Sequence, residues 1–294
     1  MPNFLDENLY SQMFSRNELV LGKENFQKLV STRIAVIGVG GVGSVVCEQL
    51  TRLGLRQLIY FARGYYELGN INRQIPATYV NVKSKTRKIH ALAQRLIEIN
   101  PFIELFPIEC DVVSENQFLK QQLKEYSPYV IFNCVDEIQA QLLVAENAAD
   151  LNCPFLIGGV TGIGLEGIVS LFTSNSPKYK DVFGSDLYKD LFLKTDSFRD
   201  GNVKEMWLKE KWDSLSPDVQ SKFRNFPSTP YPVLTPLPWL VAGIMISEFI
   251  KMRLGIQSSA IAPQAWHLRP WENQISVVNL TQQLSPYQFF PWRP

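Results

Sequence analysis

The sequence predicts an α/β protein built on a doubly wound, mainly parallel sheet. In the first half, short runs rich in β-branched residues alternate with longer runs whose apolar residues recur at helical spacing. A glycine cluster, residues 38–43, directly follows the first apolar run and opens a helical stretch. The chain has 294 residues, of which 46% are hydrophobic, so it is long enough to bury one large core. Strands and helices that alternate in this way pair their strands in parallel.

Each element of the first half follows from a local pattern. Residues 33–37 form a short, continuous apolar run, which is typical of a strand buried on both faces. Residues 84–99 carry one apolar helix face, and Asn100-Pro101 ends that helix because the residue before proline avoids helical geometry. The other predicted strands are residues 57–61, 104–109, 129–134 and 155–158, and the other predicted helices are residues 43–53, 115–125 and 139–151.

The pattern changes after Gly159. We predict a strand at residues 165–172 and then a polar insertion or lid, which has too few apolar residues for a core of its own. An apolar helix at residues 238–254 and short strands at 265–268 and 275–280 complete the domain. The predicted organisation is an N-terminal arm (1–30), a Rossmann-like core (31–172), the insertion (173–232), a C-terminal mixed-strand extension of the same domain (233–284) and a tail (285–294).

Charge, cysteine content and hydropathy exclude several classes of protein. Lys+Arg 29 nearly balance Asp+Glu 28, so the chain lacks the strongly basic balance expected of a nucleic-acid-binding protein. None of the four cysteines forms a C-x-x-C pair, so we expect neither a disulfide scaffold nor a zinc knuckle, and a cytoplasmic location fits best. Residues 1–12 lack a secretion signal, and the apolar run 233–246 is interrupted by Pro236 and Pro238, so no membrane span is predicted.

The glycine cluster is the first indication of chemistry. Gly38, Gly40, Gly41 and Gly43 lie between a predicted strand and a predicted helix, the context that a dinucleotide-binding turn requires. Glycine allows the backbone to approach a phosphate, and the helix amino terminus presents free N–H groups and a partial positive charge. The turn therefore predicts a bound nucleotide, and by itself it leaves NAD, FAD and ATP open.

Further motifs distinguish between these nucleotides. The segment Asn-Ile-Asn-Arg-Gln, residues 70–74, lies a short way beyond the second strand. Together with the glycine turn, it closely resembles the ubiquitin-activating-enzyme-like adenylyltransferase family of ThiF, MoeB and HesA type. The resemblance also rests on Ser15-Arg16, Leu21-Gly22, Lys85, Asn100-Pro101, Cys134-Val135-Asp136 and the helix at residues 241–255.

This resemblance implies an activity and a site. ATP with Mg²⁺ binds over the glycine turn, a carboxylate attacks the α-phosphate, and an acyl-adenylate forms as pyrophosphate leaves. The family pattern implies a homodimer in which Arg16 reaches the neighbouring subunit's ATP site. Cations in a dry cleft stabilise charge that develops on the phosphates, a role implied for Arg73, Lys85 and Arg16. The pattern further assigns Asn70 and Gln74 to nucleotide binding and Asp136 to Mg²⁺, although an Asp after a strand is also a common helix cap.

The chain departs from the family pattern at the end of the second strand. The family carries an acid-x-acid pair there, whose first acid binds the ATP ribose, whereas this sequence has Ala62 and Gly64 with Arg63 between them. Glu67 lies out of register for this role. An arginine at this place is also how some dinucleotide folds accept the 2′-phosphate of NADP, so an NADP-dependent oxidoreductase is one alternative. A non-catalytic member that serves as a scaffold or dimer partner is another.

Missing cysteines narrow the expected activity. The family's zinc cysteines are replaced by Pro-Lys-Tyr-Lys at residues 177–180, and residues 229–238 lack the cysteine used for thioester transfer. His90 and His267, the two histidines, are given no catalytic role. Relatives of this type include enzymes that modify a precursor peptide and enzymes that cyclise a carboxylate on tRNA. We expect a peptide or small-molecule carboxylate as substrate, because the near-neutral charge disfavours nucleic acid.

Overall fold

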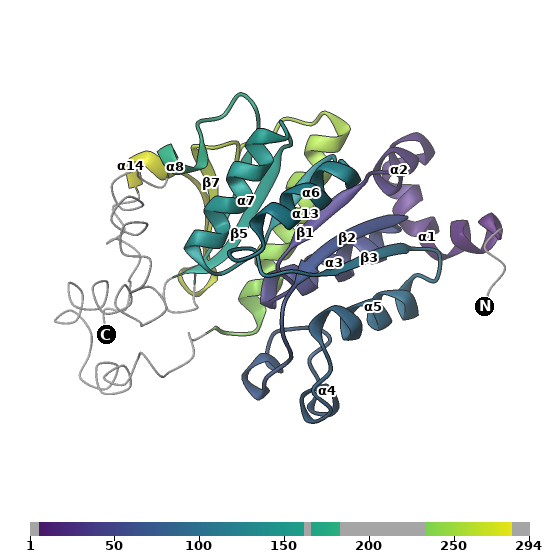
Figure 1. Cartoon of the computed structure of the whole chain (residues 1–294). Coiled ribbons are helices and arrows are strands. Elements are labelled where there is room, and N and C mark those ends of the chain that lie inside the picture. Colours follow the sequence, from purple (N-terminus) through teal and green to yellow (C-terminus); the bar gives the residue numbers. More distant parts are fainter. Residues whose placement is uncertain (1–5, 162–165, 183–232, 284–294) are drawn as a thin grey trace.

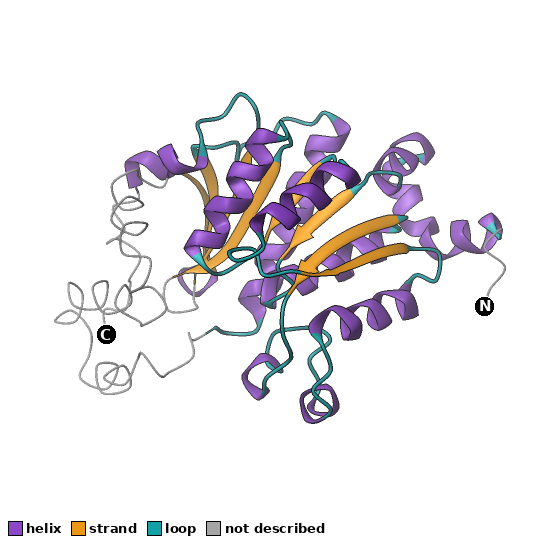
Figure 2. Ribbon diagram, in the orientation of Figure 1, coloured by secondary structure: helices purple, strands orange, loops and turns teal. Residues whose placement is uncertain are grey.

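A single mixed sheet organises the chain. The structure, a computed structural model, describes residues 6–161, 166–182 and 233–283 (Figure 1). Its eight strands lie in the order β3-β2-β1-β4-β5-β6-β7-β8 (Figures 1 and 2). Their bounds are β1 (Ile34–Ile37), β2 (Gln57–Ala62), β3 (Glu104–Glu109), β4 (Val130–Asn133), β5 (Phe155–Thr161), β6 (Glu166–Phe172), β7 (Gln264–Arg269) and β8 (Gln274–Asn279).

The direction of the strands divides the sheet in two. From β3 to β5 every neighbouring pair is parallel. The pairs β5–β6, β6–β7 and β7–β8 are antiparallel and extend the same sheet. The prediction of a doubly wound α/β fold with a mixed-strand C-terminal extension is therefore confirmed.

Helices cover both faces of this sheet (Figure 2). One core contains residues from α3 (Gly41–Leu53), α5 (Lys88–Ile99) and α13 (Pro236–Leu254). The other core contains residues from α6 (Asn116–Tyr126), α7 (Ile138–Asp150) and α8 (Tyr179–Val182). The run 34–37 is buried throughout because its alternate side chains enter the two cores, as predicted for a central strand. The short elements are α4 (Tyr79–Lys83), α14 (Leu280–Gln283), η1 (Leu68–Asn70) and η5 (Pro270–Glu272).

The amino-terminal segment is helical, where we predicted an arm without assigned elements. It forms α1 (Glu7–Leu21) and α2 (Lys23–Val30). The Tyr10 hydroxyl donates a hydrogen bond to the carbonyl oxygen of Gly54, and Asn17 Nδ2 donates to the Arg52 carbonyl oxygen at 3.0 Å. Both carbonyls belong to the carboxyl end of α3, so α1 is attached to that end of the helix.

The helix predicted at residues 84–99 begins later than expected. Helix α4, which Thr78 caps, ends at Lys83, and α5 begins at Lys88. Arg87 is extended and forms an isolated bridge with Tyr65, and Lys85 has a φ of 50°. Pairing with the segment after β2 therefore prevents residues 84–87 from joining the helix.

The first part of the predicted lid packs against the sheet. Tyr179 and Val182 of α8 are buried in the second core, and the Tyr179 hydroxyl donates to Gln141 Oε1 at 2.9 Å. Residues 183–232, the rest of the predicted lid, and the predicted tail, 285–294, lie outside the described residues. Among the residues that are described, no helix combines the length and apolarity needed to span a membrane.

Candidate functional site

The candidate site lies where the chain order of the sheet reverses. Strand β1 lies between β2 and β4, so the chain leaves it toward β2 on one side and later returns on the other. In open α/β sheets, ligands bind at this point, beyond the carboxyl ends of the strands. The glycine turn follows β1 here, and Asp136 lies three residues beyond the end of β4.

Two of the four glycines are required by the backbone itself. Gly38 has a φ of 87°, and a Cβ there would lie 2.9 Å from the Cys134 carbonyl oxygen. A Cβ on Gly43 would lie 1.8 Å from the Gly38 carbonyl oxygen, closer than any side chain permits. These two glycines therefore hold the start of α3 tightly against β1 and the loop after β4.

Of the other two glycines, Gly40 faces open space, whereas Gly41 lies under the Arg73 side chain. A Cβ on Gly40 would have no atom within 4 Å, and one on Gly41 would lie 3.1 Å from Arg73 Cδ. Gly40 is the N-cap of α3, and no side chain caps this end of the helix. The first N–H groups of a helix need acceptors, and phosphate oxygens are suitable ones. The turn thus fits the phosphates of a nucleotide.

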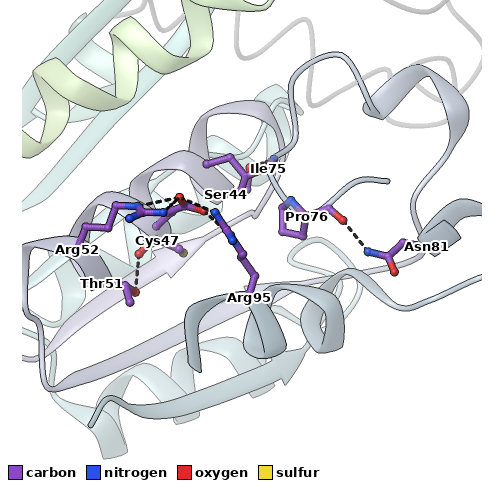
Figure 3. Close-up of polar contacts among 9 residues, drawn as sticks. Ser44, Cys47, Thr51, Arg52, Ile75, Pro76, Asn81 and Arg95 are labelled. Atoms are coloured by element: carbon purple, nitrogen blue, oxygen red, sulfur yellow. Dashed lines mark hydrogen bonds and ion pairs between the residues drawn. The ribbon is translucent and has the colours of Figure 1, made fainter. Parts of the chain in front are cut away.

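The motif at residues 70–74 is fixed by its own backbone and by α3. The Asn70 and Glu67 side chains form a reciprocal capping box around η1, and the Gln74 N–H donates to the Asn70 carbonyl oxygen at 2.9 Å. The Ile75 N–H donates to Ser44 Oγ at 3.3 Å, which joins the end of the motif to the first turn of α3 (Figure 3). Gln74 is buried, and its Oε1 has no hydrogen-bond partner among the described residues.

Helix α13 holds the motif from the other end of the chain. Thr235 Oγ1 donates to the Asn72 carbonyl oxygen at 2.6 Å, and Asn72 Nδ2 donates to the Val233 carbonyl oxygen at 2.9 Å. Trp239 Nε1 donates to the Arg73 carbonyl oxygen at 3.2 Å. The position of Arg73 therefore depends on contacts across more than 160 residues of sequence.

Arg73 lies directly over the glycine turn. Its Nη1 donates to the Gly69 carbonyl oxygen at 2.6 Å and to Asn72 Oδ1 at 2.9 Å. Burial lowers the pKa of the guanidinium below its ordinary value, while the negative charges of Asp136 and Glu67 raise it in part. Arg73 is thus a fixed cation beside the uncapped end of α3, as the sequence motif implied.

A second cation within electrostatic range of Asp136 is Lys88, which was not predicted from the sequence. Burial lowers the pKa of Lys88, and the charges of Asp136 and Glu67 oppose this shift. Its Nζ lies 5.9 Å from the centre of the Tyr66 ring. Lys85, the residue that the family resemblance implied, is exposed in the turn before α5. Helical spacing places Lys88 on the same side as the buried Leu92, and this signal distinguishes it from Lys85.

Helix α5 is tied to α3, and this connection positions Lys88. Arg95 of α5 and Arg52 of α3 both contact the carboxylate of Glu48 on α3, with Nε–Oε distances of 3.0 and 2.8 Å. Figure 3 shows the two arginines converging from their separate helices. The pair of helices that carries the glycine turn and Lys88 is therefore braced by one carboxylate.

Asp136 is exposed beyond β4 and lies within electrostatic range of both cations. The N-cap of α7 is Glu137, and no side chain makes a capping hydrogen bond to this helix. Of the two roles considered for Asp136, cap or ligand, the cap is therefore not observed. No group of three or more metal-binding side chains occurs in the described part of the chain. A Mg²⁺ ion held by Asp136 would take its other ligands from phosphates and water.

At the end of β2, Arg63 is already paired. Its guanidinium contacts Asp111 Oδ2, and its Nη2 lies 3.5 Å from Glu137 Oε2. A 2′-phosphate of NADP would compete with these two carboxylates, which disfavours the oxidoreductase alternative. Glu67 caps η1 and accepts from the Asn70 N–H, so its carboxylate already has a structural partner.

Arg16 lies far from the glycine turn of its own chain. It is exposed on α1, which is attached to the carboxyl end of α3. The 13 residues of α3 separate the two ends by about 20 Å. The structure therefore does not bring Arg16 to its own site, and a role there requires a second subunit.

The cysteines and histidines are not arranged as nucleophiles. Burial raises the pKa of the thiols of Cys47 and Cys134 well above the ordinary value, so both are poor thiolates. His90 is exposed on α5. His267 Nε2 lies 2.8 Å from Glu166 Oε2, at the antiparallel pair β6–β7. Part of the stretch 229–238 lies outside the described residues.

Known proteins share this sequence pattern over part of their length. The Bacillus subtilis tRNA threonylcarbamoyladenosine dehydratase is 35% identical over 112 residues, covering 38% of this chain and 41% of the relative. The sulfur carrier protein ThiS adenylyltransferase of the same species is 31% identical over 151 residues, covering 51% and 44%. The chain spans less than half the length of these relatives.

The fold and the family agree with the site. A crystal structure of E. coli MccB with AMPCPP and MccA superimposes with a TM-score of 0.64 and 15% identity, covering 97% of this chain and 75% of MccB. The sequence pattern of the ThiF family matches residues 14–287, nearly the whole chain and every site residue described above. The chain therefore belongs to the ThiF family.

Proposed function

We propose that this protein is an ATP-dependent adenylate-forming enzyme that activates a carboxylate. The observation that carries the proposal is Arg73, which lies against Gly41 at the uncapped amino terminus of α3 and, like Lys88, interacts electrostatically with Asp136. Two half-buried cations beside free N–H groups form an anion site, and a carboxylate beside that site suits the metal ion that accompanies a polyphosphate. This set has no evident use in hydride transfer.

Each residue has a defined task in the proposed reaction. ATP supplies the adenylyl group and the pyrophosphate leaving group. Arg73 and Lys88 hold the phosphates and stabilise the charge that grows on them, Arg73 with a planar fork and Lys88 with a point charge. The N–H groups of the first turn of α3 position the same oxygens without rearrangement. Asp136 holds Mg²⁺.

We assign the substrate to the class of peptide or small-molecule carboxylates. The similarity to MccB, solved with AMPCPP and MccA, extends over 97% of this chain and supports this assignment. The dehydratase that acts on tRNA aligns with 38% of the chain and supports tRNA as the alternative. The net charge of +1 favours the first class. The described cysteines favour direct attack on the adenylate over transfer to a thiol.

Two further assignments belong to this proposal. The enzyme works as a homodimer in the cytoplasm, and Arg16 acts on the neighbouring subunit's nucleotide. Mixing Arg16→Ala with Arg73→Ala subunits tests this, because each mixed dimer contains one intact site of two. Since about half of the dimers are mixed after random exchange, the mixture should regain about a quarter of the wild-type activity. No recovery after subunit exchange contradicts a role of Arg16 in the neighbouring site.

A non-catalytic role is the second candidate, and Ala62 and Gly64 are the observation that favours it. Without an acceptor at the end of β2, ATP would bind weakly or in an unproductive position. ATP binding without any turnover, in the presence of every carboxylate class tested, would support this candidate over the first.

Exchange of labelled pyrophosphate into ATP tests the proposed function. Purified protein is assayed with Mg²⁺ and a panel of peptides with free carboxyl termini, small carboxylic acids and tRNA. We expect exchange that depends on one of these carboxylates and that falls by about a hundredfold in Arg73→Ala. Lys120→Ala, 41% exposed on α6 over the other face of the sheet, is the control and should retain the exchange. No nucleotide binding at millimolar ATP would disprove the proposal.

A further inference from the structure

The end of β2 lacks the acceptor that an ATP ribose needs. Ala62 and Gly64 occupy the two positions at which the family pattern has acids. A Cβ on Gly64 would have no atom within 4 Å, so this place is open. A nucleotide whose phosphates lie on the first turn of α3 extends its ribose toward the end of β2. The ribose hydroxyls then require an acceptor from a neighbouring element.

Strand β3 supplies a carboxylate at the same level. In the parallel register Ala62 pairs with Glu109, and the Cys110 N–H donates to the Ala62 carbonyl oxygen at 3.2 Å. Asp111 thus follows Glu109 by two residues, as Gly64 follows Ala62. The pairing of the two strands ends at Ala62 and Glu109, and the contact between Arg63 and Asp111 holds the Asp111 carboxylate next to the end of β2.

The Asp111 carboxylate is fixed and ionised. Its Oδ1 accepts from the N–H groups of Val113 and Ser114 at 3.1 and 3.4 Å, and its Oδ2 contacts Arg63. Burial alone would raise the pKa of Asp111, but these N–H groups and the Arg63 charge lower it below the ordinary value. An ionised carboxylate has about four acceptor sites, so capacity remains for a further hydroxyl group. The side chain is 24% exposed, so a ligand can reach it.

Arg63 holds this carboxylate from the strand that lacks its own acid. It immediately follows β2 and contacts Asp111 on one side and Glu137, beyond β4, on the other. The guanidinium therefore spans the ends of strands on both sides of β1. This arrangement fixes the direction of the Asp111 side chain and balances its charge.

Two other acidic residues near the end of β2, Glu109 and Glu67, already have partners within the chain. Glu109 forms an ion pair with Arg87, whose guanidinium also lies over the Tyr65 ring at 4.9 Å. Glu67 accepts from the Asn70 N–H as the cap of η1. Asp111 differs from both in being held at the end of β2 by Arg63, the residue that follows that strand.

We propose that Asp111, held by Arg63, is the ribose-binding residue of this chain and replaces the acid missing from β2. Its carboxylate accepts a hydrogen bond from a ribose hydroxyl of ATP. This inference rests on the proposed function, because it requires ATP to bind over the glycine turn. It predicts that the protein distinguishes ATP from its deoxy forms through a residue on β3.

The test compares the affinities of ATP, 2′-deoxy-ATP and 3′-deoxy-ATP by calorimetric titration. We expect the wild-type protein to bind ATP about tenfold to a hundredfold more tightly than one of the two deoxy forms, as for a hydrogen bond to a charged group. In Asp111→Asn this ratio should fall to about threefold or less, while affinity for that deoxy form stays near the wild-type value. Glu109→Gln, on the same strand, is the control and should keep the wild-type ratio.

The outcomes separate this inference from the proposed function. Equal affinity of the wild-type protein for all three nucleotides, or full discrimination by a folded Asp111→Asn variant, overturns the role of Asp111 alone. If Asp111→Asn does not fold, Arg63→Gln serves instead, because releasing the carboxylate should also reduce the ratio. Absence of ATP binding in the wild-type protein overturns both proposals together. Pyrophosphate exchange that depends on Arg73 but shows no ribose discrimination leaves the function intact and disproves the inference.

Discussion

The two ends of the candidate nucleotide cleft are built in different ways. The phosphate end is formed mainly by backbone. Gly38 and Gly43 allow α3 to begin close against β1, and no side chain caps the first N–H groups of α3. At the ribose end, side chains from neighbouring strands meet, with Arg63 after β2 contacting Asp111 after β3. The course of the backbone therefore determines the phosphate end, whereas individual side chains determine the ribose end.

This difference indicates which groups of such a site can be supplied from another position in the sequence. Backbone donors at a helix terminus cannot be relocated without rebuilding the turn, so the glycine pattern must be present in the sequence. A carboxylate acceptor can come from either of two parallel strands, because both end at the same edge of the sheet. The phosphate end therefore follows the family motif, whereas the ribose end departs from it.

The largest expected effect comes from Gly43→Ala at the phosphate end. The new Cβ would lie 1.8 Å from the Gly38 carbonyl oxygen, and because that atom is backbone, the turn itself has to move. We expect the free energy of unfolding to fall by about 3 kcal/mol and ATP binding to be lost. Urea unfolding and nucleotide titration measure the two effects.

Gly40→Ala is the matched control for this turn. Its Cβ would have no neighbour within 4 Å, so the free energy of unfolding should change by less than about 0.5 kcal/mol. The methyl group occupies the space proposed for phosphate, so ATP binding should still weaken. If Gly43→Ala were as stable as the wild-type protein, the close contact between Gly43 and Gly38 would not be what determines the phosphate end.

A second change, in the buried part of α13, tests whether the stability of the fold can be lowered without weakening ATP binding. The fully buried Glu248 of α13 accepts from Lys251 Nζ and Trp266 Nε1, each at 2.7 Å, and from Ser258 Oγ. Glu248→Ala leaves these donors without their acceptor, so we expect a loss of about 3 kcal/mol in the free energy of unfolding. ATP affinity of the folded variant should remain within about threefold, because Glu248 lies away from Trp239, which holds Arg73.

The pH dependence of this stability has a defined sign. Burial alone would raise the pKa of Glu248, but the three donors lower it below the reference value of 4.5. A carboxylate with a depressed folded-state pKa contributes stability above its unfolded-state pKa and loses it as pH falls through the folded value. The difference between wild type and Glu248→Ala should therefore be constant near neutrality and shrink below about pH 4.5. A difference that grows in acid would contradict this account.

Lys88→Ala comes next in size and tests the reassignment of the second cation. Removing a half-buried ammonium group from the phosphates should weaken ATP binding by about tenfold to a hundredfold. Lys85→Ala, in the exposed turn, should weaken it by less than about twofold, and Lys83→Ala on α4 serves as the surface control. Titration with ATP measures all three. A larger effect at Lys85 than at Lys88 would restore the assignment made from sequence.

Sequence reasoning was most successful where a local pattern determines the structure. The central strands and the order of strand and helix follow from continuous apolar runs, and the glycine cluster correctly placed the turn between β1 and α3. Charge balance and cysteine spacing add exclusions, but they identify no partner. The family membership predicted from the motifs is confirmed.

Contacts between distant segments account for what the sequence did not predict. The apolar periodicity predicted a helix from Ser84, whereas α5 begins at Lys88, after Arg87 has formed a bridge with Tyr65. Asp111 was not predicted because its role depends on the register of β3 against β2. The amino-terminal helices depend on aromatic packing of Tyr10 and Phe14 against the end of α3, which has no local signature.

The smallest expected effect, a change of a few-fold, distinguishes the two ends of the cleft by their pH dependence. Burial lowers the pKa of Lys88 below the reference value of 10.5, so its ammonium group loses a proton earlier than an ordinary lysine as pH rises. ATP binding requires the charged form, so affinity should decline at a lower pH than it would with an ordinary lysine, and Lys88→Arg should remove most of this decline because arginine stays protonated. The ratio between ATP and the discriminated deoxy form should not change over the same range, because Asp111 is fully ionised there. A ratio that changes together with the affinity would mean that one titrating group serves both ends, and the separation between them would fail.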